Sequence, residues 1–150
     1  MFLGNLKISS PDIEPLTPIA AKHAADAGNV VPKLEISGAP DGTKEFAIIV
    51  HDPDAPLPNG FTHLTIYGIP PETTKVDTQQ PAGRIGPHGG GQNAYTGPEP
   101  PFGHGVHHYY FWVYALNDTV EGEPSREEFL TRYGKNIIEQ ARFVATYQRD

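Results

Sequence analysis

Proline and glycine interrupt this chain at short intervals, and that spacing limits the regular elements it can form. The sequence holds 16 residues of each type, spread between apolar runs rather than massed in one segment. Proline lacks a backbone donor and fixes its own φ angle, so Pro11, Pro15 and Pro18 exclude a regular helix or a central strand there. Short apolar runs separated by turn residues are typical of a β protein rather than of disorder. We therefore expect a loop-rich, mainly β fold.

Five segments have the alternation, or the β-branched and aromatic content, of β-strands. These segments are residues 2–9, 34–37, 44–51, 62–69 and 106–116. The tight connection between 34–37 and 44–51 predicts that these two strands are antiparallel neighbours. The run 106–116 is the most apolar and aromatic, and we expect a central strand that is buried on both faces.

Residues 20–26 have helical propensity for one turn at most, and the convincing helical signals lie in the C-terminal part of the chain. Ser125 followed by Glu128 has the pattern of a capping box, and apolar positions follow it. A second run, roughly 135–145, places apolar residues such as Ile137 and Ala141 at helical spacing. The prediction is an antiparallel β-sandwich with one or two C-terminal helices, formed by a single domain over residues 1–150.

Charge and residue content exclude several classes of protein. Lys and Arg number 11 against 18 Asp and Glu, so the net charge of −7 opposes a nucleic-acid partner or an anionic membrane surface. The absence of cysteine excludes disulfides and thiolate metal sites. No stretch has the pattern of a signal peptide or the length of an apolar membrane span. We expect a cytoplasmic protein without integral membrane association.

A candidate site begins where the strand 44–51 runs into the acidic, proline-stiffened sequence His51-Asp52-Pro53-Asp54-Ala55-Pro56. Asp52 has the parity of the apolar residues before it, and His107 shares one strand face with Tyr109. If these faces meet near His63, a carboxylate and two imidazoles line one pocket. Imidazole N–H groups donate to phosphoryl or carboxyl oxygens, and a carboxylate behind the ring fixes its tautomer. This set suits a small anion.

The spacing alone leaves other interpretations open. Strict alternation along 62–69 places His63 on the same face as Tyr67. Each of the histidines could also be an ordinary hydrogen-bonded residue of the core or of its rim. His63, His107 and Asp52 could instead bind a metal, although no His-x-His or i,i+4 spacing supports this. One of the histidines beside Asp52 could also act as a general acid or base. We assign no catalytic residue, no metal and no cofactor.

Several ordered motifs, taken together, are more specific than any single one of them. They are Asn29 to Lys44, Asp52-Pro53-Asp54-Ala55-Pro56, His63, Tyr95 to Pro101, Gly105-Val106-His107-His108-Tyr109, and Ala145 to Arg149. With this order and spacing, the chain resembles the phosphatidylethanolamine-binding protein family, also called the Raf kinase inhibitor protein family. The similarity is to its short bacterial and archaeal members and covers most of the chain.

The resemblance implies a β-sandwich with a pocket for phosphate or for the phosphoryl end of a lipid headgroup. By this resemblance the ligand-binding residues are Asp52, Asp54, His63, Pro101, His107 and Tyr109. The two histidines would donate to the anion, Asp52 would orient a histidine, Pro101 would form an apolar wall and Asp54 would shape the rim.

Three functions follow in order of preference. The first is a small binding protein for an anionic ligand. The second is a kinase- or protease-type inhibitor, or another interaction protein with a protein partner. The third is an acid/base enzyme that uses the same pocket. The resemblance to bacterial relatives also predicts a homodimer.

The sequence departs from the family pattern at four places. His108 replaces an arginine, which predicts the loss of an ion pair on the opposite strand face. Glu99 replaces a cysteine, and its carboxylate would repel an anion unless it points away. Leu64 replaces a tryptophan, and the sequence His88-Gly89-Gly90-Gly91 replaces Asn-Asp-Phe-Gly.

Overall fold

The computed structural model describes residues 4–150, and within this range the strands form two antiparallel sheets. The smaller sheet has the order β1-β2-β5, with bounds Lys7–Ser9, Leu34–Ser37 and Lys75–Val76. The larger has the order β6-β4-β3-β7-β8, with bounds Arg84–Ile85, Phe61–Ile69, Glu45–Asp52, His107–Leu116 and Ile137–Tyr147. Helix α1 spans Arg126–Tyr133, and short 3-10 turns span Ala21–His23 and Gly134–Asn136. The expected mainly β sandwich is confirmed.

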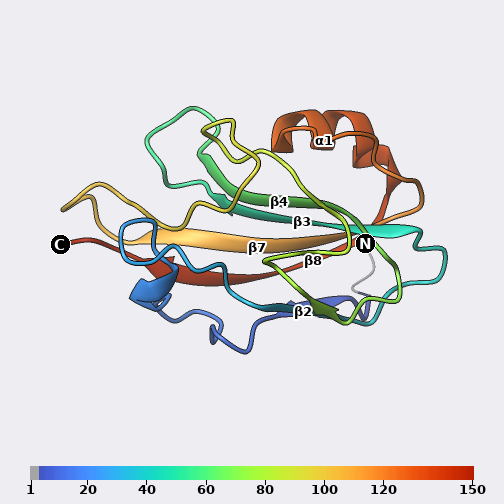
Figure 1. The fold of residues 1–150 in the computed structure, drawn as a ribbon, viewed down its shortest axis with the longest axis horizontal. Coiled ribbons are helices and arrows are strands. Elements are labelled where there is room, and N and C mark those ends of the chain that lie inside the picture. Colours follow the sequence, from blue (N-terminus) through green and yellow to red (C-terminus); the bar gives the residue numbers. More distant parts are fainter. Residues whose placement is uncertain (1–3) are drawn as a thin grey trace.

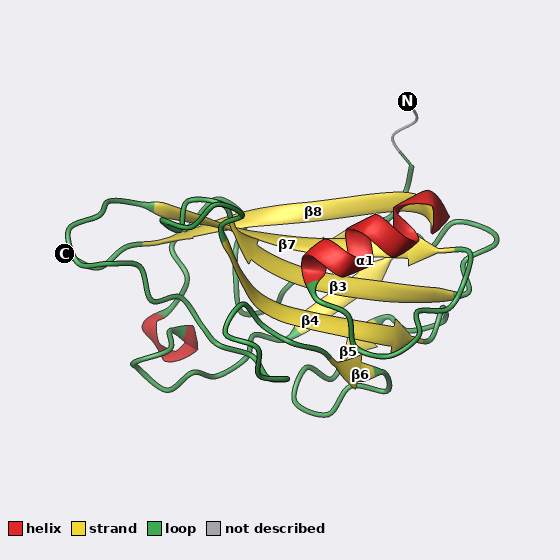
Figure 2. Cartoon of the chain, turned by 90° about the horizontal axis from the view of Figure 1, so that it is seen from above, coloured by secondary structure: helices red, strands yellow, loops and turns green. Residues whose placement is uncertain are grey.

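The larger sheet forms the middle layer of the molecule (Figure 1). Its inner face packs on the smaller sheet, and this core joins Ile36 to Ile48 and Phe111. Its outer face packs on α1, where Phe129 and Tyr133 meet Tyr67. Figure 2 shows α1 lying across this outer face. Every residue of β3 is buried because both layers cover that strand.

The predicted helix near residue 126 is confirmed, including its capping box. The Ser125 side chain accepts from the Glu128 backbone N–H, and the Glu128 carboxylate accepts from the Ser125 backbone N–H. Both bonds satisfy donors that the first helical turn leaves without a partner.

The second predicted helix, over 135–145, is wrong because this segment is strand β8. It pairs with β7 along its whole length, and Phe143 stacks on Phe111 with ring centroids 4.5 Å apart. Ala141, Phe143 and Ala145 also recur at period two, and these residues face the core. A short segment can satisfy both periods, and pairing with the long strand β7 decides between them.

Two strand predictions also need correction. The segments 34–37 and 44–51 are not neighbours, because β2 pairs with β1 and β5 whereas β3 pairs with β4 and β7. The connection between them crosses from one sheet to the other, so the two strands face each other across the core. The first predicted strand, 2–9, is reduced to Lys7–Ser9, and its residues 2 and 3 lie outside the described residues.

Strand β7 is interior to its sheet, as expected, but only its second half is buried on both faces. From Val113 to Leu116 every residue is buried, whereas His108 is exposed and Tyr110 and Trp112 are half-buried. Helix α1 covers only part of the outer face, so the first half of β7 faces solvent there (Figure 2). This first half carries the predicted site residues on the opposite, inner face.

Candidate functional site

Four of the predicted site residues, Asp52, His63, His107 and Tyr109, meet at one end of the larger sheet, on three neighbouring strands. Asp52 ends β3, and β7 begins at His107. The register pairs His51 with Tyr110, so the next residues along the two strands, Asp52 and Tyr109, lie at the same level. Because β3 is antiparallel to β4 and β7, its end adjoins the beginnings of both. The parity argument for Asp52, His107 and Tyr109 therefore predicted their common location.

His63 reaches this location through a β-bulge. Val50 pairs with Leu64 but His51 pairs with Thr62, so β4 has one extra residue at this point. A bulge changes the direction of side chains beyond it. The expectation that His63 shares a face with Tyr67 is therefore wrong. The His63 ring instead contacts the inner-face Tyr109, with ring centroids 5.2 Å apart in an edge-on arrangement.

These strand ends and two loops enclose a cavity of about 300 Å³. Its lining residues are Asp52, Ala55, Pro56, Leu57, Phe61, His63, Thr96, Gly97, Glu99, Pro100, Pro101, His107 and Tyr109. Five of the six predicted site residues belong to this set, and Asp54 does not. No lysine or arginine belongs to it within the part of the chain that the structure describes.

A buried carboxylate–imidazole pair forms the floor of the site. His107 Nδ1 donates to Asp52 Oδ2 at 2.7 Å, and both side chains are almost fully buried. The other carboxylate oxygen of Asp52 accepts the backbone N–H of Asp54 at 2.7 Å. These contacts fix the orientation of the carboxylate and place a proton on Nδ1 of His107.

His104 is a member of the site that the sequence interpretation missed. Its Nδ1 lies 2.6 Å from Nε2 of His107, so both ring nitrogens of His107 have protein partners. The signal in the sequence was the concentration of histidines at 104, 107 and 108. Phe61 and Thr96 were also missed, because neither residue type indicates a binding site without a structure.

His63 has a defined tautomer. Its Nδ1 lies 2.7 Å from the carbonyl oxygen of Thr96, which can only accept, so the proton is on Nδ1. Burial lowers the pKa of His63 to about 4, against the opposing effects of the Thr96 hydrogen bond and the charge of Asp52. At neutral pH the ring is therefore uncharged. Its Nε2 carries a lone pair and is not a donor.

Tyr109 brings a hydroxyl group without a partner to the cavity. The residue is 1% exposed, and its hydroxyl oxygen makes no hydrogen bond. Burial raises the pKa of this hydroxyl, and the negative charges of Asp52 and Asp54 act in the same direction. A buried polar group without a partner is costly and uncommon in folded proteins. The cavity wall thus holds a buried hydroxyl near the Asp52 carboxylate that has no acceptor within hydrogen-bond distance.

Asp54 and His108 form a second pair on the other face of β7. Asp54 Oδ2 accepts from both the backbone N–H and Nδ1 of His108, each at 2.7 Å. Burial alone would raise the pKa of Asp54, but these hydrogen bonds outweigh it and lower that pKa. Position 108 thus keeps a hydrogen bond to Asp54, which is an ion pair only when the histidine is protonated. Asp54 ties the loop after β3 to β7 and does not line the cavity.

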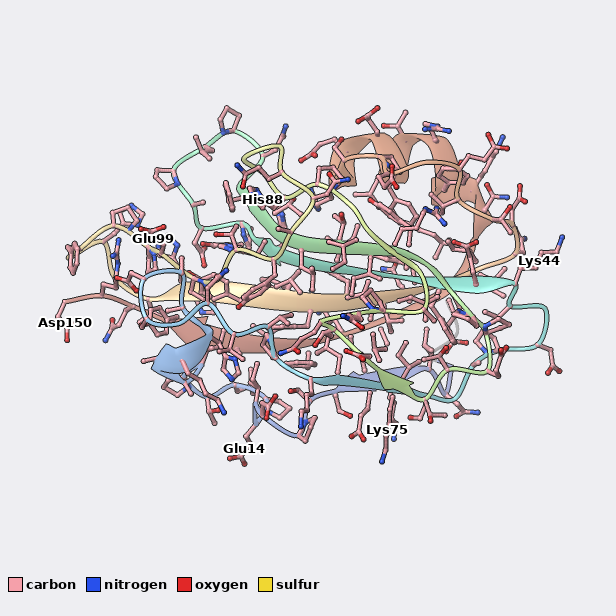
Figure 3. All side chains as sticks on the ribbon, in the orientation of Figure 1. Glu14, Lys44, Lys75, His88, Glu99 and Asp150 are labelled. Carbon is pink, nitrogen blue, oxygen red and sulfur yellow. The ribbon has the colours of Figure 1, made fainter. Side chains whose placement is uncertain are left out.

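The two remaining sequence expectations concern the outer wall. Pro101 lines the cavity as expected. Glu99 also lines it, but this residue is exposed. Figure 3 shows Glu99 at the end of the molecule that also holds Asp150. Its carboxylate can remain in solvent, which weakens the repulsion of an anion by screening.

Two further findings apply to residues 4–150. No group of three or more His, Asp or Glu side chains there has an arrangement that could hold a metal ion. No helix in this range combines the length and the apolar character needed to cross a membrane.

Fold and site together define a β-sandwich protein with a ligand-sized cavity at a sheet end. The family model of the phosphatidylethanolamine-binding proteins matches residues 9–148. The UPF0098 protein PH1269 of Pyrococcus horikoshii is 38% identical in an alignment 141 residues long that covers 87% of this chain and 71% of that protein. The chain belongs to the phosphatidylethanolamine-binding protein family.

Solved structures agree with this assignment. YbcL of Escherichia coli, described as a member of the mammalian PEBP family, has a TM-score of 0.88 and 30% identity, with 97% of this chain and 99% of YbcL covered. CT736 of Chlamydia trachomatis has a TM-score of 0.89 and 26% identity, with 99% and 100% covered.

Proposed function

We propose that this protein binds a small ligand through a phosphate or phosphoryl group in the cavity between Asp52, His63, His107 and Tyr109. The observation that carries the proposal is the cavity of about 300 Å³ lined by these four residues, of which Tyr109 has a buried hydroxyl without a hydrogen-bond partner. A phosphoryl oxygen would supply the acceptor that this hydroxyl lacks. The apolar residues of the same wall, among them Pro101, would contact the remainder of the ligand.

The charges of the cavity determine how such a ligand would bind. Asp52 and Glu99 are acidic, and neutral His63 presents a lone pair. An anion therefore gains a donor from His63 only when that ring takes up a proton. Binding of phosphate would raise the pKa of His63 from about 4 and would couple to proton uptake. Affinity for phosphate should accordingly increase as the pH falls.

Titration calorimetry would test the proposal with two probes, inorganic phosphate and phosphoethanolamine. Measurements at about pH 5.5 and about pH 7.5, on either side of the reference histidine pKa, should show tighter binding at the lower value. Two buffers of different ionisation enthalpy would give the number of protons taken up. The two probes separate a preference for free phosphate from a preference for a headgroup.

A matched variant would locate the binding site. His63→Asn keeps an amide N–H in the place of Nδ1, toward the Thr96 carbonyl, and removes the ring nitrogen Nε2. We expect phosphate affinity to fall by roughly tenfold, the value of one charged hydrogen bond, and the proton uptake to disappear. Absence of binding by the wild-type protein at both pH values would refute the proposal.

An acid/base activity is the second candidate, and the hydrogen-bond chain from Asp52 through His107 to His104 favours it. Such a chain can carry a proton between a buried carboxylate and the exposed His104. Turnover of a panel of phosphoesters and lactones, lost in His107→Asn, would support this candidate. A panel without turnover would exclude it for those substrates.

The protein partner, the homodimer and the cytoplasmic location stay predictions from the sequence. Light scattering of the purified chain would measure its mass in solution and so test the dimer.

A further inference from the structure

The loop that precedes β7 places one histidine on another. His104 is exposed, yet its Nδ1 lies 2.6 Å from Nε2 of the buried His107, and the two ring centroids are 4.9 Å apart. The cavity is lined by His107 but not by His104. This hydrogen bond therefore occupies Nε2 of His107, a cavity residue, with the side chain of His104, which does not line the cavity.

Both protonation patterns of this contact occupy Nε2 of His107. The hydrogen bond to Asp52 keeps a proton on Nδ1. If His107 is neutral, its Nε2 accepts a hydrogen bond from the Nδ1–H of His104. If His107 is an imidazolium, its Nε2–H donates to the lone pair on Nδ1 of His104. In either case His107 has no ring nitrogen left for a ligand while His104 stays in place.

The loop has the conformational freedom to move His104. Gly103 and Gly105 flank it with φ angles of 71° and 96°, and a Cβ added at either residue would meet nothing within 4 Å. These values lie in the left-handed region, where glycine costs little. The space around both residues is open, so rotation of the segment would not displace packed neighbours.

The base of the same loop is held in place. Arg149 Nε donates to the carbonyl oxygen of Pro100 at 2.6 Å, and the Gly103 N–H donates to the Arg149 carbonyl oxygen at 2.9 Å. The Arg149 guanidinium also lies 4.1 Å from the centre of the Phe102 ring and contacts Asp26 Oδ2 at 2.9 Å. These contacts fix the start of the loop. The His104 N–H also donates to the Pro101 carbonyl oxygen at 3.1 Å, so the ring leaves His107 either by side-chain rotation or by opening of this one turn bond.

We infer that His104 is the residue that sets ligand affinity at this site, as an internal competitor for Nε2 of His107. The inference rests on the proposed function, since it concerns the same cavity. A phosphoryl oxygen that binds His107 must first displace His104, and rotation about the flanking glycines would extend the cavity to the freed nitrogen. The exchange replaces one hydrogen bond with another, so it favours ligands that carry a strong acceptor. An apolar ligand that fills the cavity gains nothing from displacing His104.

Three variants would test this role by phosphate titration at about pH 5.5, below the reference histidine pKa. His104→Ala removes the competing nitrogen, and we expect phosphate to bind roughly three- to tenfold more tightly, the range given by one neutral hydrogen bond. His104→Asn places an amide N–H where Nδ1 was, so its affinity should return to that of the wild type. Val106→Ala, on the same loop and about half exposed, controls for general loosening and should bind as the wild type does.

Each outcome bears on one proposal or on both. Tighter binding by His104→Ala with rescue by His104→Asn supports the competitor role. Equal binding by wild type and His104→Ala overturns the competitor role and leaves the proposed function in place. Weaker binding by His104→Ala also overturns it, because His104 would then be a ligand donor. Failure of the wild type and of His104→Ala to bind phosphate overturns both proposals.

A spectroscopic measurement separates this role from a structural one. Nitrogen-15 NMR of the histidine rings reports whether Nε2 of His107 is hydrogen-bonded. In the wild type this signal should change on addition of phosphate, and in His104→Ala it should already differ before phosphate is added. An unchanged His107 signal in His104→Ala would refute the contact itself.

Discussion

The buried histidines predict a specific loss of stability in mild acid. Burial lowers the pKa of His63 from 6.5 to about 4 in the folded state, while the unfolded chain keeps a value near 6.5. Between these values the unfolded state binds more protons than the folded state, so stability decreases as the pH falls from about 6.5 toward 4. Above this window the neutral ring imposes no such penalty.

The size of this loss of stability follows from the difference between the pKa values of His63 in the folded and unfolded states. Each pKa unit corresponds to about 1.4 kcal/mol, so at about pH 4.5 His63 should reduce the free energy of unfolding by about 2.5 kcal/mol. His51 has a pKa that burial lowers to about 4 as well, and it lies on the other face of the sheet, where its Nδ1 lies 3.2 Å from Thr62 Oγ1. The two contributions are coupled, because the charge of His51 also lowers the pKa of His63.

Urea denaturation at about pH 7 and about pH 4.5 would measure the effect, within the window that the two pKa values define. His63→Asn and His51→Asn each remove one titrating ring, and each variant should lose about 2 kcal/mol less than the wild type on acidification. The comparison uses the difference between two pH values, so a constant change in stability from either substitution cancels. If both variants show the same pH dependence as the wild type, the assignment of low pKa values to these two rings is wrong.

Three further predictions concern the fold and the site. Ser125→Ala removes the helix cap and should lower the free energy of unfolding by about 1 kcal/mol, measured by urea denaturation. Phe143→Ala removes the ring stacked on Phe111 in the core and should cost about 3–5 kcal/mol in the same assay; a cost below about 1 kcal/mol would contradict the packing of β8. Asp54 accepts the backbone N–H of His108, so Asp54→Ala should accelerate hydrogen exchange of that amide. The same variant should change phosphate affinity far less than Asp52→Asn does.

The sequence predicted the fold class because its evidence was local and repeated. Alternation, turn residues and the capping box each describe a few neighbouring residues, and those patterns correspond to β2, β3, β4, β7 and α1. The errors arose where distant segments decide the outcome. Residues 137–147 form a strand because β7 lies beside them, and β2 joins the smaller sheet because the chain crosses the core after it.

The site residues likewise divide into those that local patterns predicted and those whose positions depend on distant segments. Period two was sufficient to bring Asp52, His107 and Tyr109 to one face, since their strands are regular up to that end of the sheet. His63 arrives there through a bulge, which is a mismatch between two strands and leaves no signal in either one. The His104–His107 bond depends on how a glycine-flanked loop folds back, and residue spacing alone does not define that path.

The contacts of Arg149 have a consequence for the order of folding. Strand β7 and the loop before it are completed by β8 and by Arg149, which lie roughly 20 to 50 residues further along the chain. Contacts of such separation form slowly, because loop closure costs entropy before the contact returns any stability. The strand ends around Asp52 and His63 can pair while β8 is still unformed. The wall that contains Pro100 and Pro101 cannot be anchored until Arg149 is in place. The ligand site should therefore be among the last parts of the molecule to mature, and ligand binding should report complete folding rather than collapse.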